Sequence, residues 1–455
     1  MKKRTGKLLM MLLACMGMVH LSNAQKGADT ARKTYKFSVQ QAVDYAKQNN
    51  IQEKNALIDY KIQQQTNREI TSAAYPQLST SGTFQDYLSI PTSLIPAEFS
   101  GGAAGTYFPV KFGTKYSVTG GFDLSQLLFD GQVFVGLKAR PVALQFYSKQ
   151  AEVTEEMINV NVQKIYYQLV VGRQQMTSFD ANIERFQKLL HDTKAIFQQG
   201  FAERLDVDKV TVQLSNLQTE KIKMQSQLDA GTAGLKFLMN MPQKDSLVLT
   251  DSITEDKIKQ NILSDDYRYE DRKEYQLIML GKKLGEYNVS RYKLSYLPSL
   301  AAFANYSKNA QRQEFNFFKG GSEGSWFTTS LVGLKLTIPI FDGFAKDSRL
   351  KKAKLQLQQT TNNIELLKSS IDNDVVDARL KITAAVVTID NQKQNMQLAE
   401  KVYNSTKLKY EQGLGSNLEI INAQTDLKQA QNNYYSALYD GIIAKIDYLK
   451  ATGKL

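Results

Sequence analysis

The second half of this chain of 455 residues repeats the first half. Two sets of residues recur about 213 positions later: Phe129-Asp130-Gly131 as Phe341-Asp342-Gly343, and Gly200, Leu205 and Asp206 as Gly413, Leu418 and Glu419. A period of this length is too long for a solenoid repeat. It indicates one large unit that was duplicated and fused. We expect the two copies to be related by a pseudo-symmetry axis and to build a ring or a tube.

The N-terminus has the pattern of a secretory signal peptide. A basic segment at residues 2–7 precedes an apolar stretch at residues 8–21, and Ser22-Asn23-Ala24 supplies the small residues of a cleavage site. Residues 1–24 are therefore predicted to be a signal peptide that is removed. The alternative is lipidation at Cys15, because the residues before it loosely fit a lipoprotein signal.

Cysteine and histidine are nearly absent from the sequence. Cys15 is the only cysteine, and cleavage after Ala24 would leave His191 as the single histidine. This composition excludes disulfides, zinc sites built from Cys and His, and most histidine-dependent catalysis. We therefore expect no enzyme, no cofactor and no metal site. The net charge is +12, but the sequence contains no polybasic run interleaved with aromatic residues. Nucleic-acid binding is therefore not expected.

Proline positions and apolar spacing predict two long helical hairpins. No proline falls between Pro141 and Pro242 or after Pro339, and proline inside a helix costs about 3 kcal/mol. Both stretches keep an apolar spacing of four and three, which is typical of helices packed as coiled coils. The spacing is carried by Ile158, Val162, Leu169, Phe179 and Phe186 in the first and by Ile371, Val375, Ala378, Ile382 and Ile389 in the second. We expect the hairpins at about residues 142–240 and 344–450.

Period-two alternation predicts two strand hairpins, at about residues 76–129 and 298–341. Apolar and polar residues alternate in 78–88, 116–125 and 334–340, a pattern that is typical of membrane β-barrel strands but weak in any one strand. No mature segment has 18 consecutive apolar residues, so transmembrane helices are not expected. Four strands cannot close a membrane barrel, and open edges are not tolerated in lipid. Three copies would supply 12 strands.

Aromatic residues crowd the loops between the expected strands. Tyr107 and Phe108 lie in the first loop region, and Trp326 and Phe327 lie at the end of the second. These four residues are candidates for an aromatic belt at a membrane interface. The alternative is that they are aromatic residues of loops that face solvent.

The chain resembles the TolC-like outer-membrane efflux and secretion family over essentially all of its mature length. The match depends on the duplicated order of strand hairpin, long helix, tip and return helix, and on the two Phe-Asp-Gly triplets at the strand-to-helix junctions. Further matching segments are Tyr410–Gly413, Leu418–Gln424 and the closing Tyr448–Leu455. The resemblance implies a mostly α-helical homotrimer. Its 12-stranded barrel, with four strands from each protomer, would lie in outer-membrane lipid and continue into a long coiled-coil tunnel in the periplasm.

The resemblance also implies a function as a passive exit duct. An inner-membrane pump, of RND or ABC type, would supply the energy, and a periplasmic adaptor protein would connect the pump to the duct. The expected cargo is small molecules such as drugs. The alternatives are type I protein secretion, metal-ion efflux and, from another class, a periplasmic coiled-coil scaffold whose strands never enter lipid.

By the same resemblance, two groups of residues are candidate sites. Gly200, Arg204, Leu205, Asp206, Gly413 and Leu418 lie at the tips that would meet the adaptor. Acidic residues after the second tip form a ring that narrows the entrance, and the matching positions are Glu419 and Asn422. Asn422 departs from the acidic pattern, which puts a double ring in doubt. Glu419 has an alternative or additional role as a helix N-terminal carboxylate.

The resemblance further divides the mature chain into three parts. Residues 25–245 would be the first repeat and residues 273–455 the second. Residues 246–272, which are rich in Asp and Glu and lie off the heptad pattern, would be a linker at the collar around the middle of the tunnel.

Overall fold

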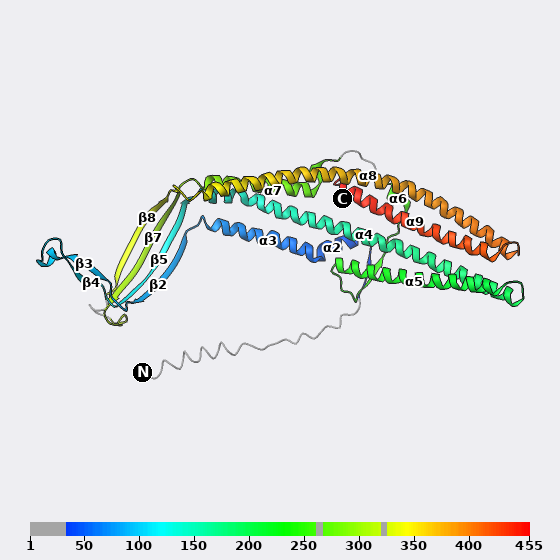
Figure 1. Ribbon diagram of the computed structural model, residues 1–455, viewed down its shortest axis with the longest axis horizontal. Coiled ribbons are helices and arrows are strands. Elements are labelled where there is room, and N and C mark those ends of the chain that lie inside the picture. The colour runs from blue at the N-terminus through cyan, green and yellow to red at the C-terminus, as the bar shows by residue number, and fades with distance from the viewer. Residues whose placement is uncertain (1–32, 261–266, 320–324) are drawn as a thin grey trace, which may run out of the picture.

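The computed structural model describes residues 33–260, 267–319 and 325–455, and the molecule is strongly elongated (Figure 1). A four-stranded sheet lies toward one end, and long helices extend from it to the other. Residues 1–24, the predicted signal peptide with Cys15, lie outside the described residues. None of the described helices is long and apolar enough to cross a bilayer.

The sheet is antiparallel and has the strand order β2-β5-β7-β8. Its strands are β2 (Gln77–Asp86), β5 (Tyr116–Phe129), β7 (Ser299–Arg312) and β8 (Phe327–Thr337). The pairing of β5 with β7 joins the strands of the first half to those of the second. Within the described part of the chain, β2 and β8 are edge strands, each paired on one side only.

The two faces of the sheet differ in polarity. Strand pairing places residues of one parity on each face. One face, called the apolar face here, carries Leu78, Phe84, Val118, Phe122, Leu124, Ala302, Ala304, Val332 and Leu334. The other, called the polar face, carries Ser79, Ser81, Thr83, Ser117, Thr119, Asp123, Asn305, Ser307 and Thr329.

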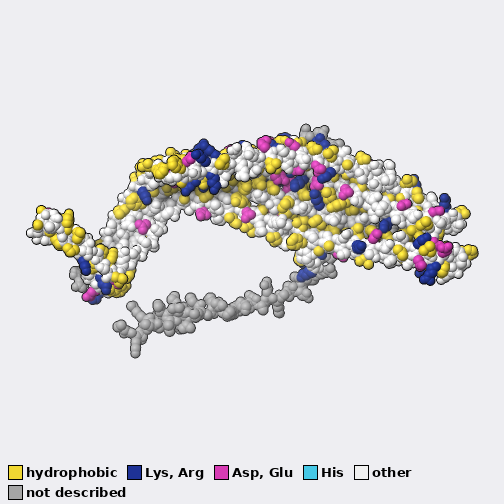
Figure 2. Space-filling model, viewed as in Figure 1, with side chains coloured by type: hydrophobic (Ala, Val, Ile, Leu, Met, Phe, Trp, Pro, Cys, Tyr) yellow, Lys and Arg dark blue, Asp and Glu magenta, His cyan; other side chains and the backbone are white. Residues whose placement is uncertain are grey.

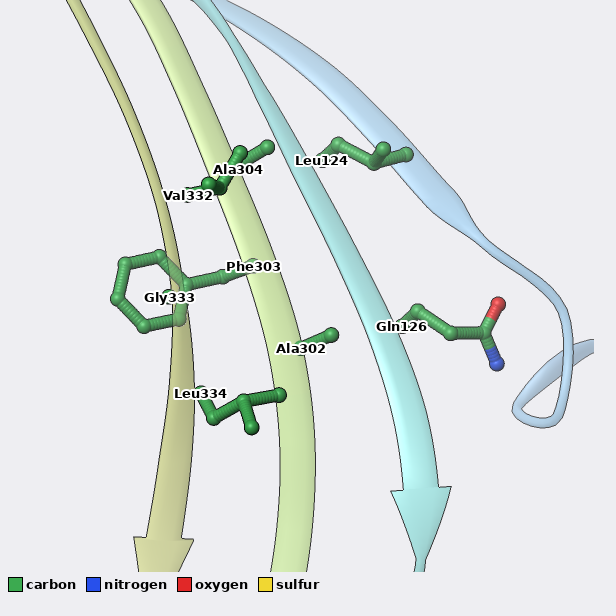
Figure 3. Close-up of a pocket in the computed structure, with 8 residues that line it drawn as sticks. All are labelled: Leu124, Gln126, Ala302, Phe303, Ala304, Val332, Gly333 and Leu334. Atoms are coloured by element: carbon green, nitrogen blue, oxygen red, sulfur yellow. The ribbon is translucent and has the colours of Figure 1, made fainter.

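The apolar face is open to the surroundings in a single chain. Val332 is 84% exposed, and Leu78 and Leu334 are each close to 70% exposed. Figure 3 shows a shallow depression on this face, lined mainly by Leu124, Ala302, Ala304, Val332 and Leu334. A row of large apolar side chains left in this state needs an apolar environment outside the chain.

Two strand predictions differ from the structure. The alternation at 334–340 extends past the end of β8 at Thr337, because Pro339 has no N–H to donate to a strand ladder. The loop after β2 contains an additional hairpin, β3 (Thr92–Pro96) and β4 (Tyr107–Lys111). Figure 1 shows this hairpin projecting beyond the sheet, away from the long helices.

Four helices continue the four strands in the same order. α3 (Ile51–Ser72) leads into β2, α4 (Gly131–Gln198) follows β5, α7 (Lys273–Leu294) leads into β7, and α8 (Ala345–Glu411) follows β8. α3 packs on α4, α4 on α7, and α7 on α8. α4 has 68 residues and α8 has 67, so each is about 100 Å long at 1.5 Å per residue.

Proline placement predicts that the first long helix begins after Pro141, but α4 begins at Gly131. The Asp130 carboxylate caps the helix by accepting from the N–H groups of Gln132 and Val133. Pro141 lacks the N–H that would bond Leu137 O, and the Arg140 side chain donates to that oxygen at 3.1 Å instead. A substitute donor and a strong cap therefore allow the helix to run through proline.

The corresponding junction in the second half is built differently. Gly343 and Phe344 both have positive φ, and α8 begins only at Ala345. Asp342 accepts from the Lys346 N–H at 3.0 Å. The two Phe-Asp-Gly triplets thus mark equivalent junctions, but with different backbone paths.

The heptad residues form the helical core, as their spacing predicts. α5 (Arg204–Leu238) returns against α4, and α9 (Asn417–Ala451) returns against α8. Ile158, Val162, Ile371, Ile382 and Ile389 are completely buried. The two hairpins contact each other mainly through α4 and α9.

A small belt of structure surrounds the middle of the helices. β1 (Thr34–Phe37) pairs in parallel with β6 (Ser246–Leu249), and α2 (Val39–Asn49), α6 (Glu255–Lys259) and a 3-10 turn (Tyr269–Asp271) complete it. Residues 246–272, predicted to form a mid-tunnel collar, contain β6, α6 and this turn, while 261–266 lie outside the described residues.

Candidate functional site

The tips of both helical hairpins are tight glycine turns at equivalent positions. Gly200 has φ +80° and Gly413 has φ +75°, a conformation that favours glycine because it has no Cβ. The following N–H groups, of Phe201 and Leu414, bond back to Ile196 O and Lys409 O at 3.0 and 2.9 Å. These bonds satisfy helix-end carbonyls and fix each turn.

Asp206 and Glu419 occupy the same place in the two return helices. Asp206 accepts from the Glu203 N–H at 3.4 Å, and the Glu419 N–H donates to Ser416 Oγ at 3.2 Å. Both carboxylates therefore lie in the first turn of a helix, where the helix dipole favours a negative charge. The duplicated sequence thus produces a duplicated local structure at the two tips.

The two tips also contact each other. The Asn417 side chain donates to Asp206 O at 3.2 Å, joining the start of α9 to the start of α5. One to two turns back from the tips, Thr193 and Tyr410 share a hydrogen bond of 3.2 Å between α4 and α8. The candidates Arg204, Leu205 and Leu418 are exposed at these tips, and Arg204 lies 3.8 Å from Asp208.

Buried polar residues connect the hairpins behind the tips. Asn182 on α4 is 2% exposed and donates to Gln431 on α9 at 2.9 Å. Arg185 bonds Asn182 at 3.1 Å, and its guanidinium lies 5.4 Å from the Tyr403 ring centre. Burial raises the pKa of Tyr403, and the Arg185 charge opposes that rise. Polar groups buried at helix contacts fix the register of those helices, because a shifted register would leave them unpaired.

Glu419 and Asn422 are both exposed on one face of α9, and the opposite face is buried in the core. One turn further along the exposed face lies Asp426, which is exposed too. No ion pair or hydrogen bond of the Asp426 side chain is found within the described residues. Asp426 is not among the candidates predicted from the sequence, although it lies seven positions from Glu419 on the same exposed face.

The aromatic candidates lie in different surroundings. Trp326 precedes β8, and its ring centre lies 6.4 Å from that of Phe317 in a cluster with Phe315, Phe84 and Tyr116. Phe327 pairs with Asn309 and so belongs to the polar face. Tyr107 and Phe108 lie in β4 of the projecting hairpin rather than beside the main sheet.

Comparisons with known proteins agree with this architecture. Residues 284–454 match the family model described as outer membrane efflux protein. Outer membrane protein TolC of Vibrio cholerae is 20% identical over 352 residues, which cover 74% of this chain and 77% of that protein. Residues 284–454 thus form a domain of the outer membrane efflux protein family, and TolC-like outer-membrane efflux proteins are homologues of the chain. Members of this family are passive channels and not enzymes.

Further matches extend over most of the chain. Alkaline protease secretion protein AprF of Pseudomonas aeruginosa is 20% identical over 339 residues, covering 70% of this chain and 66% of that protein. A crystal structure of CusC superposes with a TM-score of 0.74 at 16% identity, covering 91% of this chain and 92% of that chain. The chain thus has the fold of these outer-membrane channels, mostly helical with a strand part.

Proposed function

We propose that three copies of this chain form the exit duct of a tripartite pump that expels small molecules. The observation that carries the proposal is the sheet, which has one apolar face, one polar face and two edges that no other described strand pairs with. Pairing β8 of one copy with β2 of the next would remove all edges and give 12 strands. The apolar face would then contact lipid, and the polar face would line a water-filled passage.

The tips are the proposed contacts for the periplasmic adaptor. Gly200, Arg204, Leu205 and Asp206 end the first hairpin, and Gly413 and Leu418 end the second. They lie at the end of the helical part farthest from the sheet (Figure 1). An inner-membrane transporter, of RND or ABC type, would supply the energy, because a duct without catalytic chemistry has none of its own.

The exposed face of α9 is the proposed entrance constriction. In a threefold arrangement, Glu419 and Asp426 would each form a ring of three carboxylates, with Asn422 between them. Like charges brought together in this way attract cations. The second acidic ring that Asn422 lacks would therefore be supplied by Asp426, one helical turn further from the tip.

The proposal is tested on the protein extracted from outer membranes in detergent. Native mass spectrometry should give three times the mature chain mass, and loss of the gene should make cells accumulate a fluorescent small-molecule efflux substrate. A protein that stays soluble and monomeric without detergent would support the scaffold alternative instead. Normal dye efflux with lost export of a protease would favour type I secretion, the function named for AprF. Sensitivity to metal ions alone would favour metal-ion efflux.

A further inference from the structure

Exposed aromatic residues mark the place where the sheet meets the helices. These residues, called the junction belt here, are Tyr75, Phe129, Phe134, Tyr296, Phe341 and Phe344, each at least 39% exposed. They come from all four strand-helix connections. Phe129 pairs with Leu300 on the apolar face, and its ring centre lies 5.6 Å from that of Phe134 on α4. The apolar face therefore continues into the junction belt.

Basic residues follow the junction belt on the helical side. This basic patch consists of Lys138 on α4, Lys293 on α7, and Arg349, Lys351, Lys352 and Lys354 on α8, all of them exposed. Figure 2 shows Lys and Arg side chains gathered where α7 and α8 adjoin the sheet. From the sheet toward the tips, the surface thus changes from apolar to aromatic to basic.

Most of this positive charge is not neutralised within the chain. Lys351 pairs with Asp347 at 2.8 Å, and nearby Lys346 pairs with Asp342 at 3.2 Å. In the part of the chain that the structure describes, no ion pair involves Arg349, Lys352 or Lys354. Arg349 and Lys352, three positions apart, lie on one side of α8 and repel each other, so they favour an anionic partner. Lys354, five positions from Arg349, lies about 140° round the helix from it and adds positive charge at the same level.

A second copy of the chain does not supply that negative charge. Its free α3 edge would carry the exposed Asp59, Lys61, Arg68 and Glu69, which together have no net charge. The position of the patch points to a different partner. It lies next to aromatic residues of the kind found at the depth of lipid headgroups, on the side toward the periplasm. The phosphates of anionic lipids attract basic residues there, and the attraction is lost within a Debye length.

We propose that the basic patch binds the headgroups of anionic phospholipids in the periplasmic leaflet of the outer membrane. This inference rests on the proposed function, because it needs the sheet to lie in the bilayer. The aromatic side chains of the junction belt would lie at the depth of the lipid glycerol groups. Arg349 and Lys352 would contact the phosphates, and Lys354 would add to the positive charge near them. The lipid contact would fix the depth of the duct in the membrane.

The test uses the purified, delipidated full chain in detergent. Phosphatidylglycerol or phosphatidylcholine is added, and retained lipid is counted by native mass spectrometry. The wild type should retain phosphatidylglycerol in preference to phosphatidylcholine. The triple variant R349Q/K352Q/K354Q should bind phosphatidylglycerol about tenfold more weakly or worse, given the usual effect of each basic residue near an anionic surface. Equal binding by the wild type and the triple variant would overturn the inference.

Two matched variants separate charge at this place from charge in general. K188Q/K209Q/K223Q removes three exposed lysines from the first helical hairpin, toward its tip, and should bind phosphatidylglycerol like the wild type. R349K/K352R/K354R keeps the charges and should also bind like the wild type. If inorganic phosphate displaces phosphatidylglycerol completely at equal concentration, the site is a simple anion site and the lipid assignment is wrong.

The same spectra separate this inference from the function that it depends on. A detergent-dependent trimer without lipid preference overturns the lipid site alone. A chain that does not form a trimer in detergent overturns the duct, and with it the lipid site.

Discussion

At the scale of single residues, the carboxylates on the exposed face of α9 are expected to set ion preference. Glu419→Gln should weaken cation preference and block by multivalent cations, since it removes three charges from one ring of a trimer. Asp426→Asn should have a similar, additive effect if both rings line the entrance. The reversal potential of single channels in planar bilayers under a salt gradient measures both.

The first tip offers a matched control for these substitutions. Asp208→Asn removes an exposed carboxylate from α5, where it lies 3.8 Å from Arg204, and should leave the selectivity unchanged. If Glu419→Gln and Asp208→Asn have the same selectivity as the wild type, Glu419 is only a helix-capping charge. An effect of Asp426→Asn alone would place the constriction about two helical turns further from the tip than Glu419.

At the scale of elements, the sequence predicts the parts that local rules control. The heptads of Ile158 and Ile371 identify the long helices because burial there has the period of a helix. The start of α4 is not predicted, because a side-chain donor from Arg140 replaces the bond that Pro141 cannot make. Pairing of β1 with β6 depends on contacts between residues more than 200 positions apart, which no local pattern records. Asp426, which we propose as part of a second acidic ring, is not predicted from the sequence because its place on the exposed face of α9 belongs to no motif.

The short helix α6 is held against the second hairpin by a cluster of charges. Glu255 accepts from Tyr434 OH at 2.7 Å and forms an ion pair with Lys393 at 3.0 Å. Lys445 donates to Gln260 O at 2.9 Å. Burial opposes ionisation of Glu255, but the bonds from Tyr434 and Lys393 hold its pKa below the ordinary value of 4.5. The ionised carboxylate therefore joins the mid-helix belt to both α8 and α9.

Glu255→Gln should lower the stability of the assembly by about 1–2 kcal/mol at pH 7, since it weakens charge-assisted bonds. Because the folded pKa is lowered, the stabilisation by Glu255 is present above pH 4.5 and is lost as the pH falls through the folded pKa. The difference in melting temperature between wild type and variant, followed by circular dichroism, should thus shrink below pH 4.5. The neighbouring exposed Asp256→Asn serves as the control. A difference that is the same at pH 7 and at acid pH would contradict this account.

At the scale of the whole molecule, the proposed trimer must present a continuous apolar band to lipid. Substitutions at two positions of β8, one on each face of the sheet, test this requirement. Val332 lies on the apolar face beside Ala304, and Thr329 lies on the polar face beside Ser307. Val332→Lys should disfavour insertion by about 2–4 kcal/mol per copy if the residue is near the middle of the bilayer. Thr329→Lys should cost little, because its side chain would face water inside the duct. The two variants are compared by their yield of trimer in isolated outer membranes, measured by native gel electrophoresis.

Loss of trimer with Thr329→Lys but not with Val332→Lys would mean that the sheet is inserted with its faces reversed. Equal trimer yields for both variants would mean that neither face contacts lipid, and the channel assembly proposed for this chain would then be wrong.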